Sequence, residues 1–252
     1  MIKKSNLPKI SHVLSILTLV SLAQCTTPEV IEATATAPYI NSLGMKFVPI
    51  PGTSVLMCTT EVTIDQFQAM GLERTVPVYP QSGNHPVVNV SYSDAETWCS
   101  LASRKDKVSY RLPTKEEWIL AAGSSIYPWG LSWPPTSGSC NALGQEAKNE
   151  EIKGLMLSTG ATSTTVIGGF IDQHSFTSPV GTYSPNARGL YDMAGNVFEL
   201  LEDTDSQELG LQLRIGGSWA SSTHDQFQMS KEHGLEADDR DIYTGFRVVI
   251  DQ

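Results

Sequence analysis

The sequence predicts an α+β domain with much irregular structure, covering residues 41–252. Three observations support this: a strand-turn-strand pattern within residues 45–62, three helix starts with the same capping chemistry, and a long stretch rich in Gly, Ser, Thr, Asn and Pro over residues 123–213. A chain of 252 residues with 40% hydrophobic content can bury a substantial core. No internal repeat at a solenoid period is present, so one domain is the economical interpretation.

The first predicted element is a β-hairpin. Residues 45–50 alternate as a strand does, residues 54–62 offer a second strand, and Pro51-Gly52 supplies the turn between them. At the other end, residues 213–250 open with a strand and close with another over 245–250.

Three helices are predicted where an N-cap hydroxyl is followed three residues later by an acid or amide that returns to the N-cap backbone. These pairs are Thr63 with Gln66, Ser93 with Glu96, and Thr114 with Glu117. The second and third helices each carry an apolar face, made of Ala95, Trp98, Cys99 and Ala102 in one and Trp118, Ile119, Ala121 and Ala122 in the other.

Between residues 123 and 213 the sequence offers only short apolar runs, and helix is expected to be scarce. A long irregular stretch inside a compact domain is unusual unless bound ions hold the loops or the loops carry function. This stretch is therefore where a site is expected.

The charge excludes one class of partner. The formal net charge is −10, and it becomes more negative if Lys3, Lys4 and Lys9 are removed with a leader. Such an acidic chain repels phosphate backbones, so no nucleic acid is expected as partner.

The N-terminus resembles a secretion signal. Lys3, Lys4 and Lys9 precede a short apolar run over residues 10–23, which is too short to span a bilayer comfortably and ends at a lipobox-like Leu22-Ala23-Gln24-Cys25. We expect residues 1–25 to be a lipoprotein signal peptide with lipid on Cys25, and residues 26–40 to be a flexible tether. Because Gln24 replaces the usual small residue, plain secretion with ordinary cleavage stays open.

This interpretation places the protein in a bacterial cell envelope, lipid-anchored at the outer membrane or cell surface, or secreted or periplasmic if it is not lipidated. Three further cysteines remain, Cys58, Cys99 and Cys140, and the sequence does not assign a disulfide among them. None of the spacings is typical of a zinc site.

An ordered set of motifs along almost the whole chain resembles the formylglycine-generating enzyme (sulfatase-modifying factor) family. The motifs are Asn41-Ser42-Leu43-Gly44-Met45, Glu61-Val62-Thr63, His85-Pro86-Val87-Val88-Asn89-Val90-Ser91, Tyr110-Arg111-Leu112-Pro113-Thr114-Lys115-Glu116-Glu117-Trp118, Tyr127-Pro128-Trp129-Gly130, Ser178-Pro179-Val180-Gly181, Gly189-Leu190-Tyr191-Asp192-Met193-Ala194-Gly195-Asn196-Val197-Phe198-Glu199, Gly216-Gly217-Ser218-Trp219 and Gly245-Phe246-Arg247. The resemblance implies that family's variant of the C-type-lectin-like fold, with structural calcium.

The resemblance also implies where calcium would lie. One family site matches the side chains of Asp192 and Glu199 with the carbonyls of Gly195 and Val197. A second matches the side chains of Asn141 and Asp172 with the carbonyls of Ala142 and His174. Oxygen donors of this kind suit a hard cation, although the same acids could instead cap turns.

The redox residues of the family are missing. Active members carry two cysteines that bind copper and oxidise a substrate cysteine to formylglycine, and the matching positions here hold Ser221 and Gln226. A hydroxyl and an amide cannot replace thiolates as Cu(I) ligands, so neither copper nor any catalytic residue is expected.

The sequence therefore favours a non-catalytic module that binds a protein, peptide or glycan ligand through the C-terminal loops. Its candidate binding residues are Ser218, Trp219, Ser221, Ser222, His224, Asp225 and Gln226. The alternatives are a divergent sulfatase-modifying factor or other oxidoreductase, and a structural component of the envelope.

Overall fold

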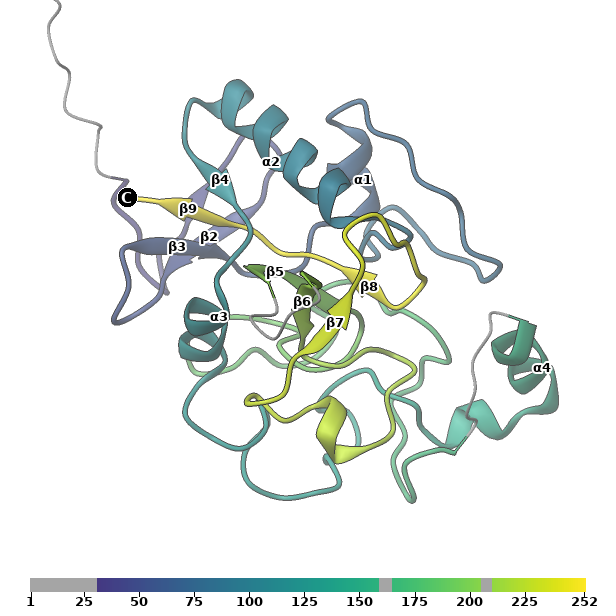
Figure 1. Cartoon of the computed structure of the whole chain (residues 1–252). Helices are drawn as coiled ribbons and strands as arrows, with labels where there is room; N and C mark the ends of the chain where they lie inside the picture. The colour runs from purple at the N-terminus through teal and green to yellow at the C-terminus, as the bar shows by residue number, and fades with distance from the viewer. Residues whose placement is uncertain (1–30, 159–164, 205–209) are drawn as a thin grey trace, which may run out of the picture. The chain divides into compact units, whose positions relative to one another are not determined.

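Two small β-sheets and four helices, joined by long loops, make up the part of the chain that the structure describes (Figure 1). The structure is a computed structural model and describes residues 31–158, 165–204 and 210–252. The predicted signal peptide, Cys25 and most of the predicted tether lie outside these residues.

The first sheet contains five antiparallel strands in the order β1-β2-β3-β9-β4. Its strands are β1 (Tyr39–Ile40), β2 (Lys46–Pro49), β3 (Val55–Cys58), β4 (Tyr110–Arg111) and β9 (Val249–Asp251). The predicted hairpin is confirmed as β2 and β3, and Gly52 takes the positive φ of 92° that the turn requires.

The folded part begins earlier than the predicted boundary at residue 41. Strand β1 lies in the range assigned to the tether, and it pairs with β2 while the Tyr39 ring packs 6.1 Å from Phe47. Further upstream, the Gln252 side chain donates to the Ile31 carbonyl at 2.7 Å. Composition suggested a tether here, but Ile31, Ala33 and Tyr39 pack against the first core cluster.

The helices are α1 (Ile64–Gln68), α2 (Tyr92–Asp106), α3 (Lys115–Ala122) and α4 (Glu150–Ser158), with 3-10 turns η1 (Gln145–Lys148) and η2 (His224–Gln226). The capping boxes of α1 and α3 are confirmed at Thr63 and Thr114. The predicted cap of α2 was wrong: Ser91, not Ser93, caps it, because the Asp94 carboxylate returns to the Ser91 amide at 2.9 Å. Helix α4 lies in the stretch where helix was expected to be scarce.

The predicted apolar helix faces form the core. The α2 face packs with Phe47, Leu56 and Phe246, and the Trp98 and Phe246 ring centroids are 5.8 Å apart. On α3, Trp118, Ala121 and Ala122 are buried, while Ile119 is only partly buried. Helices α2 and α3 thus both pack against strands of the first sheet.

The second sheet has the strand order β7-β6-β5-β8. Its strands are β5 (Phe198–Thr204), β6 (Gln212–Ile215), β7 (His233–Leu235) and β8 (Thr244–Gly245), and only the β5–β8 pair is parallel. The single strand predicted over 245–250 is instead two strands, because the chain passes from β8 in this sheet to β9 in the first sheet. Arg247 lies in this crossing.

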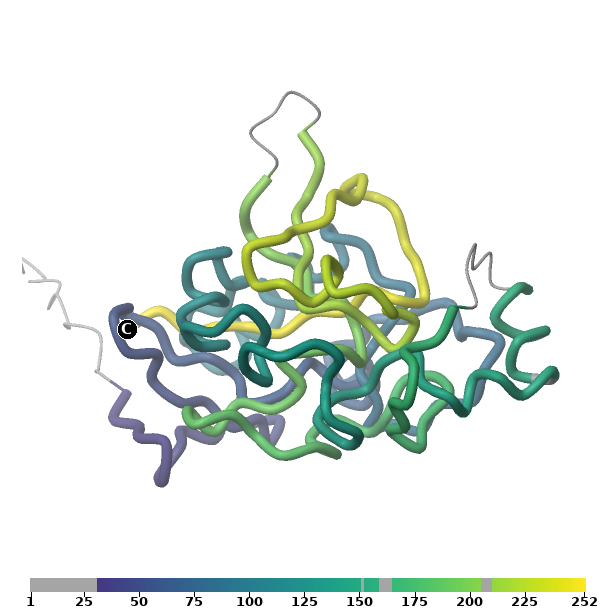
Figure 2. The backbone as a smooth tube through the Cα atoms, turned by 90° about the horizontal axis from the view of Figure 1, so that it is seen from below, coloured from purple at the N-terminus to yellow at the C-terminus, as the bar shows by residue number. Residues whose placement is uncertain are grey.

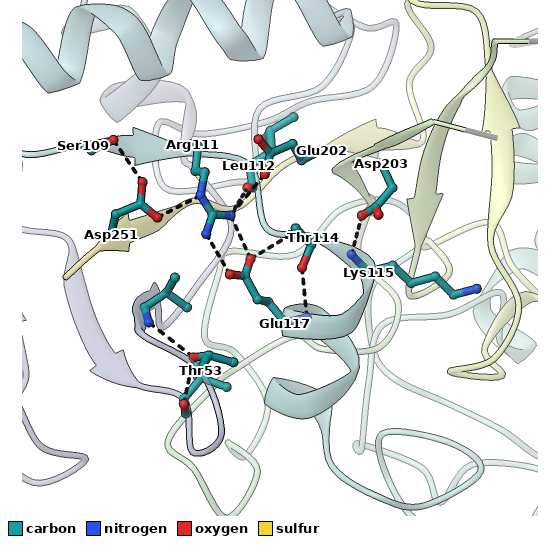
Figure 3. A network of polar contacts seen from close by, with 12 residues as sticks. Thr53, Ser109, Arg111, Leu112, Thr114, Lys115, Glu117, Glu202, Asp203 and Asp251 are labelled. Carbon is teal, nitrogen blue, oxygen red and sulfur yellow. Dashed lines mark hydrogen bonds and ion pairs between the residues drawn. The ribbon is translucent and has the colours of Figure 1, made fainter. Parts of the chain in front are cut away.

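A charged network joins the two sheets (Figure 3). Arg111 on β4 contacts Glu117 of α3 at 2.7 Å, Glu202 of β5 at 3.2 Å and Asp251 of β9 at 2.9 Å. Because these side chains are partly exposed, each pair is expected to contribute on the order of 1 kcal/mol or less.

The loops 124–145 and 217–231 lie side by side in both views (Figures 1 and 2). The Met229 amide donates to the Ile126 carbonyl at 3.1 Å, and the Leu143 amide donates to the Ser221 carbonyl at 2.9 Å. In the described part of the chain, none of the helices has the length and apolar character needed to cross a bilayer.

Candidate functional site

The C-terminal loop that follows β6 is fixed by tight backbone packing. Gly216 and Gly217 have positive φ angles of 98° and 79°, and a Cβ on Gly217 would lie 2.6 Å from the Phe227 ring. The Trp219 amide donates to the Asn196 carbonyl at 2.9 Å. These contacts hold the first part of the loop against the rest of the domain.

Trp219 is buried in an aromatic box rather than exposed. Its ring lies 5.0–5.5 Å from the rings of Tyr79, Phe176 and Tyr243, and its indole nitrogen donates to the Ile242 carbonyl at 3.0 Å. Ser218 and Ser221 are buried as well. Three of the seven predicted binding residues thus lie in the interior, because the loop uses them to pack against the domain.

Ser221 and Gln226, which the family resemblance matches to the cysteine positions, are used in hydrogen bonds within the loop. The Ser218 amide donates to the Ser221 hydroxyl at 3.0 Å. The amides of Ser222 and Thr223 donate to Gln226 Oε1 at 2.9 and 3.1 Å. Both side chains therefore fix the course of the loop.

The exposed part of the loop is at η2. Ser222 and Gln226 are half-buried, whereas His224 and Asp225 are exposed and lie 3.2 Å apart. The His224 ring meets Trp133 edge-on, with 5.8 Å between centroids. A ligand could reach these residues, in contrast to Trp219.

Four aromatic residues beside η2 form what we call the aromatic wall: Tyr127, Trp129, Trp133 and Phe227. Trp129 stacks on Tyr127 with centroids 4.9 Å apart and meets Phe227 at 5.3 Å, and Trp133 lies 6.0 Å from Phe227. Nearby, Ile126 is 50% exposed and Leu131 is 71% exposed. Tyr127 and Trp129 belong to one of the family motifs, but no pattern in the sequence predicts that they form a surface with Trp133 and Phe227.

A pocket of about 280 Å³ opens beside the aromatic wall. Its lining includes Pro128, Trp129, Ser139, Ser184, Met193 and Ala194. Together with η2, the wall and this pocket form the candidate ligand surface.

The cysteines of the described residues are unsuited to thiolate chemistry. Cys58, Cys99 and Cys140 are free and buried. Burial raises the thiol pKa of Cys58 to about 11 and that of Cys99 to about 12, and it also raises the pKa of Cys140. These thiols are protonated at neutral pH, and the thiolate is the reactive and metal-binding form.

Buried charged side chains cluster where the loop 178–197 meets the core. The Glu199 carboxylate accepts hydrogen bonds from Arg247 Nε and Nη2, both at 2.6 Å, and from the Trp118 indole N–H at 2.7 Å. Asp192 accepts the Gly181 amide at 2.6 Å through Oδ2, but its buried Oδ1 has no partner. Burial raises the pKa of Asp192 to about 6.

Glu61 also belongs to this cluster, although it was predicted only as part of a motif. Its side chain is fully buried against the Asp192 carboxyl group, and no N–H or hydroxyl group donates to either of its oxygens. Burial, with Asp192 and Glu199 nearby, raises its pKa well above the usual range. Since Arg247 is the counter-ion of Glu199, two buried carboxyl groups remain without one.

The second predicted calcium position has a similar shortage of positive charge. Asp172 accepts the amides of Ala142 at 2.6 Å and His174 at 2.8 Å, and Asn141 Oδ1 is buried without a partner. Burial and the neighbouring Glu146 carboxylate raise the pKa of Asp172 to about 8. Glu146 was not predicted, and its Oε2 also lacks a partner.

At both predicted calcium positions, buried oxygen atoms without hydrogen-bond partners are donors of the kind that a hard cation takes. Within residues 31–158, 165–204 and 210–252, no three His, Cys, Asp or Glu side chains could by themselves hold a metal ion. Any cation here would therefore need amide or backbone oxygens in addition to carboxylates. The predicted Gly195 and Val197 carbonyls belong to the chain that joins Asp192 to β5.

Comparisons with known proteins agree with the motifs. The family described as "Sulfatase-modifying factor enzyme 1-like domain" matches residues 53–252. The formylglycine-generating enzyme of Thermomonospora curvata is 34% identical over 125 residues, which is 48% of this chain and 34% of that protein. The inactive C-alpha-formylglycine-generating enzyme 2 of Mus musculus is 30% identical over 173 residues, covering 64% of this chain and 48% of that protein.

The chain thus spans about a third to a half of the length of these curated relatives. Among solved structures, PvdO from Pseudomonas aeruginosa superposes with a TM-score of 0.61 at 21% identity, over 79% of this chain and 80% of that one. At this identity the likeness concerns the fold alone, which is the predicted α+β, C-type-lectin-like fold with much irregular structure.

Proposed function

Because the chain belongs to the sulfatase-modifying factor enzyme 1-like family, we propose that it is a non-catalytic member that binds a protein, peptide or glycan ligand. One observation carries the proposal. The two positions where the family's chemistry needs sulfur hold Ser221 and Gln226, and both side chains are engaged in hydrogen bonds within the loop. A Cu(I) site built on soft thiolates has no ligands there.

The cysteines elsewhere do not supply a substitute. The described thiols are buried and protonated, and none lies in the C-terminal loop. A relative named as an inactive formylglycine-generating enzyme 2 supports the view that a member of this family can lack the activity.

The purified chain is expected to form no formylglycine when incubated with a sulfatase-type cysteine peptide, copper and oxygen, because it lacks the sulfur ligands. Mass spectrometry of the peptide checks this, with an active formylglycine-generating enzyme as positive control. The double variant Ser221→Cys with Gln226→Cys is the matched control, and it should bind Cu(I) more tightly than the wild type in a chelator competition. An aldehyde product from the wild-type chain would instead support the alternative, a divergent modifying oxidoreductase.

We place ligand contact at η2 and the aromatic wall. These residues combine partly exposed aromatic surface with the exposed polar groups of His224 and Asp225, and ligand sites characteristically combine aromatic walls with a few polar groups. The buried Ser218, Trp219 and Ser221 then act as the support of this surface.

Trp133→Ala is expected to abolish binding to peptide and glycan arrays, because it removes the ring between His224 and Phe227. The unfolding temperature should also fall, because Trp133 packs against three other rings, so circular dichroism must show that the variant is folded at the assay temperature. The matched variant Ile40→Ala alters an exposed residue of β1 and should keep full binding. Equal array signals for the wild type and Trp133→Ala would rule out this surface.

The cellular location and the bound calcium are two further parts of the proposal. We infer anchoring in a bacterial envelope through lipid on Cys25, supported by the signal-like sequence of residues 1–25, and mass spectrometry of the mature N-terminus tests it. We also infer structural calcium at Asp192 and at Asn141 with Asp172, supported by buried oxygens without partners. Calcium would cross-link loops that have little regular structure of their own.

A further inference from the structure

Glu61 is the most unusual polar group among the described residues. It follows β3, its relative exposure is 0%, and both carboxylate oxygens lack a partner. Buried polar groups are nearly always hydrogen-bonded, and an isolated buried carboxylate costs far more than an isolated hydroxyl. A fully buried carboxyl group in this state either keeps its proton or needs a positive partner.

The neighbouring cation, Arg247, forms its ion pair with Glu199 and not with Glu61. Arg247 directs its guanidinium to Glu199, to the Cys58 carbonyl at 3.2 Å and to the Tyr191 carbonyl at 2.9 Å. Asp192 lies next to Glu61, is only 8% exposed, and has its own unpartnered Oδ1. The two carboxyl groups therefore meet in the interior within hydrogen-bonding reach of each other, and Arg247, whose charge acts on both, makes no hydrogen bond to either.

We propose that Glu61 and Asp192 together bind one calcium ion, with Glu61 as a ligand in addition to those that the family resemblance implies. This rests on the calcium part of the proposed function. The two unpartnered carboxylates would balance the two charges of the ion, and backbone carbonyls and water would complete the roughly six to eight oxygens that calcium takes. Glu199 is already neutralised by Arg247, so Glu61 supplies the second charge.

The position of Glu61 gives the ion a specific structural effect. Glu61 belongs to the segment between β3 and α1, whereas Asp192 belongs to the loop 178–197. The Tyr191 amide donates to the Thr59 carbonyl at 2.8 Å, so the two segments are already in contact. An ion shared by Glu61 and Asp192 would fasten the loop onto the core.

Calcium titration of the full chain with Glu61→Gln tests the proposal, because the amide keeps the volume and removes the charge. Isothermal titration should show an affinity loss of about tenfold or more at one of two sites. Terbium luminescence excited through Trp118, whose indole contacts Glu199, should fall in parallel. Asp172→Asn is the matched control, and it should weaken the other site alone.

Thermal unfolding separates a ligand from a merely structural residue. In EDTA, Glu61→Gln should unfold at the same temperature as the wild type or higher, because it removes a buried charge. In calcium, the wild type should be the more stable. An unchanged calcium affinity in Glu61→Gln, or an equal destabilisation with and without calcium, would overturn the proposal.

The outcome is independent of the non-catalytic function. The peptide assay decides whether the chain makes formylglycine, and the calcium titration needs no ligand and no catalysis. A wild-type chain that binds no calcium would refute this inference and leave the assignment as a binding module intact.

Discussion

Arg247→Met is expected to lower the free energy of unfolding by roughly 3–5 kcal/mol, since it removes one partner of a fully buried ion pair. Arg247 is 0% exposed, and its guanidinium serves Glu199 and two backbone carbonyls. After the substitution, Glu199 would be a buried charge beside Asp192 and Glu61. The cost of that uncompensated charge exceeds the loss of the hydrogen bonds themselves.

Urea unfolding followed by Trp fluorescence measures this effect. The matched control is Arg111→Met, which breaks an ion-pair network of similar size on a side chain that is 25% exposed (Figure 3). There the expected loss is about 1 kcal/mol, because solvent screens the charges left behind. Equal losses in the two variants would contradict the interpretation that burial determines the cost.

Gly195→Ala is expected to destabilise the domain by roughly 3–5 kcal/mol or to prevent folding, because it combines backbone strain with a backbone collision. Gly195 has φ +75°, and a Cβ there would meet the Asn141 carbonyl oxygen far inside the 3.0 Å that real Cβ atoms keep. Relief would require the Gly195–Gly216 and Asn196–Asn141 hydrogen bonds, both 2.9 Å long, to give way. The loops of both predicted calcium positions would then separate.

The chain contains a closely matched control for this substitution. Gly169 has the same φ of +75°, and no atom lies within 4 Å of the Cβ position. Gly169→Ala should therefore cost only the strain of a left-handed backbone, about 1 kcal/mol. The difference between the two melting transitions isolates the collision, and a similar loss in both would show that strain alone dominates.

Local chemistry made much of the scaffold predictable. Thr63 with Gln66 and Thr114 with Glu117 satisfy helix-start donors over three residues, so the sequence contains all the information needed. The α2 cap was misplaced because Ser91 and Ser93 each have an acid three residues later, and spacing alone does not rank them.

The site was harder to predict because its parts come from distant segments. Trp219 was predicted as a binding residue of the C-terminal loops, yet Tyr79, Phe176 and Tyr243 from three other segments enclose it. Glu61 and Asp192 likewise come from segments that are distant in the sequence and meet only in the folded domain. No local pattern marks a contact that only the fold creates.

The position of β9 has a consequence for how the domain folds. This strand, residues 249–251, lies inside its sheet between β3 and the edge strand β4, so Ile250 pairs with Leu56, a residue nearly 200 positions earlier in the sequence. Such distant pairing slows folding and makes it cooperative, because little of the sheet is stable before the last strand arrives. A fragment that ends before β9 would leave the backbone hydrogen-bonding groups of β3 and β4 unpaired at an exposed edge. Such truncated chains should therefore aggregate and lose the candidate ligand surface.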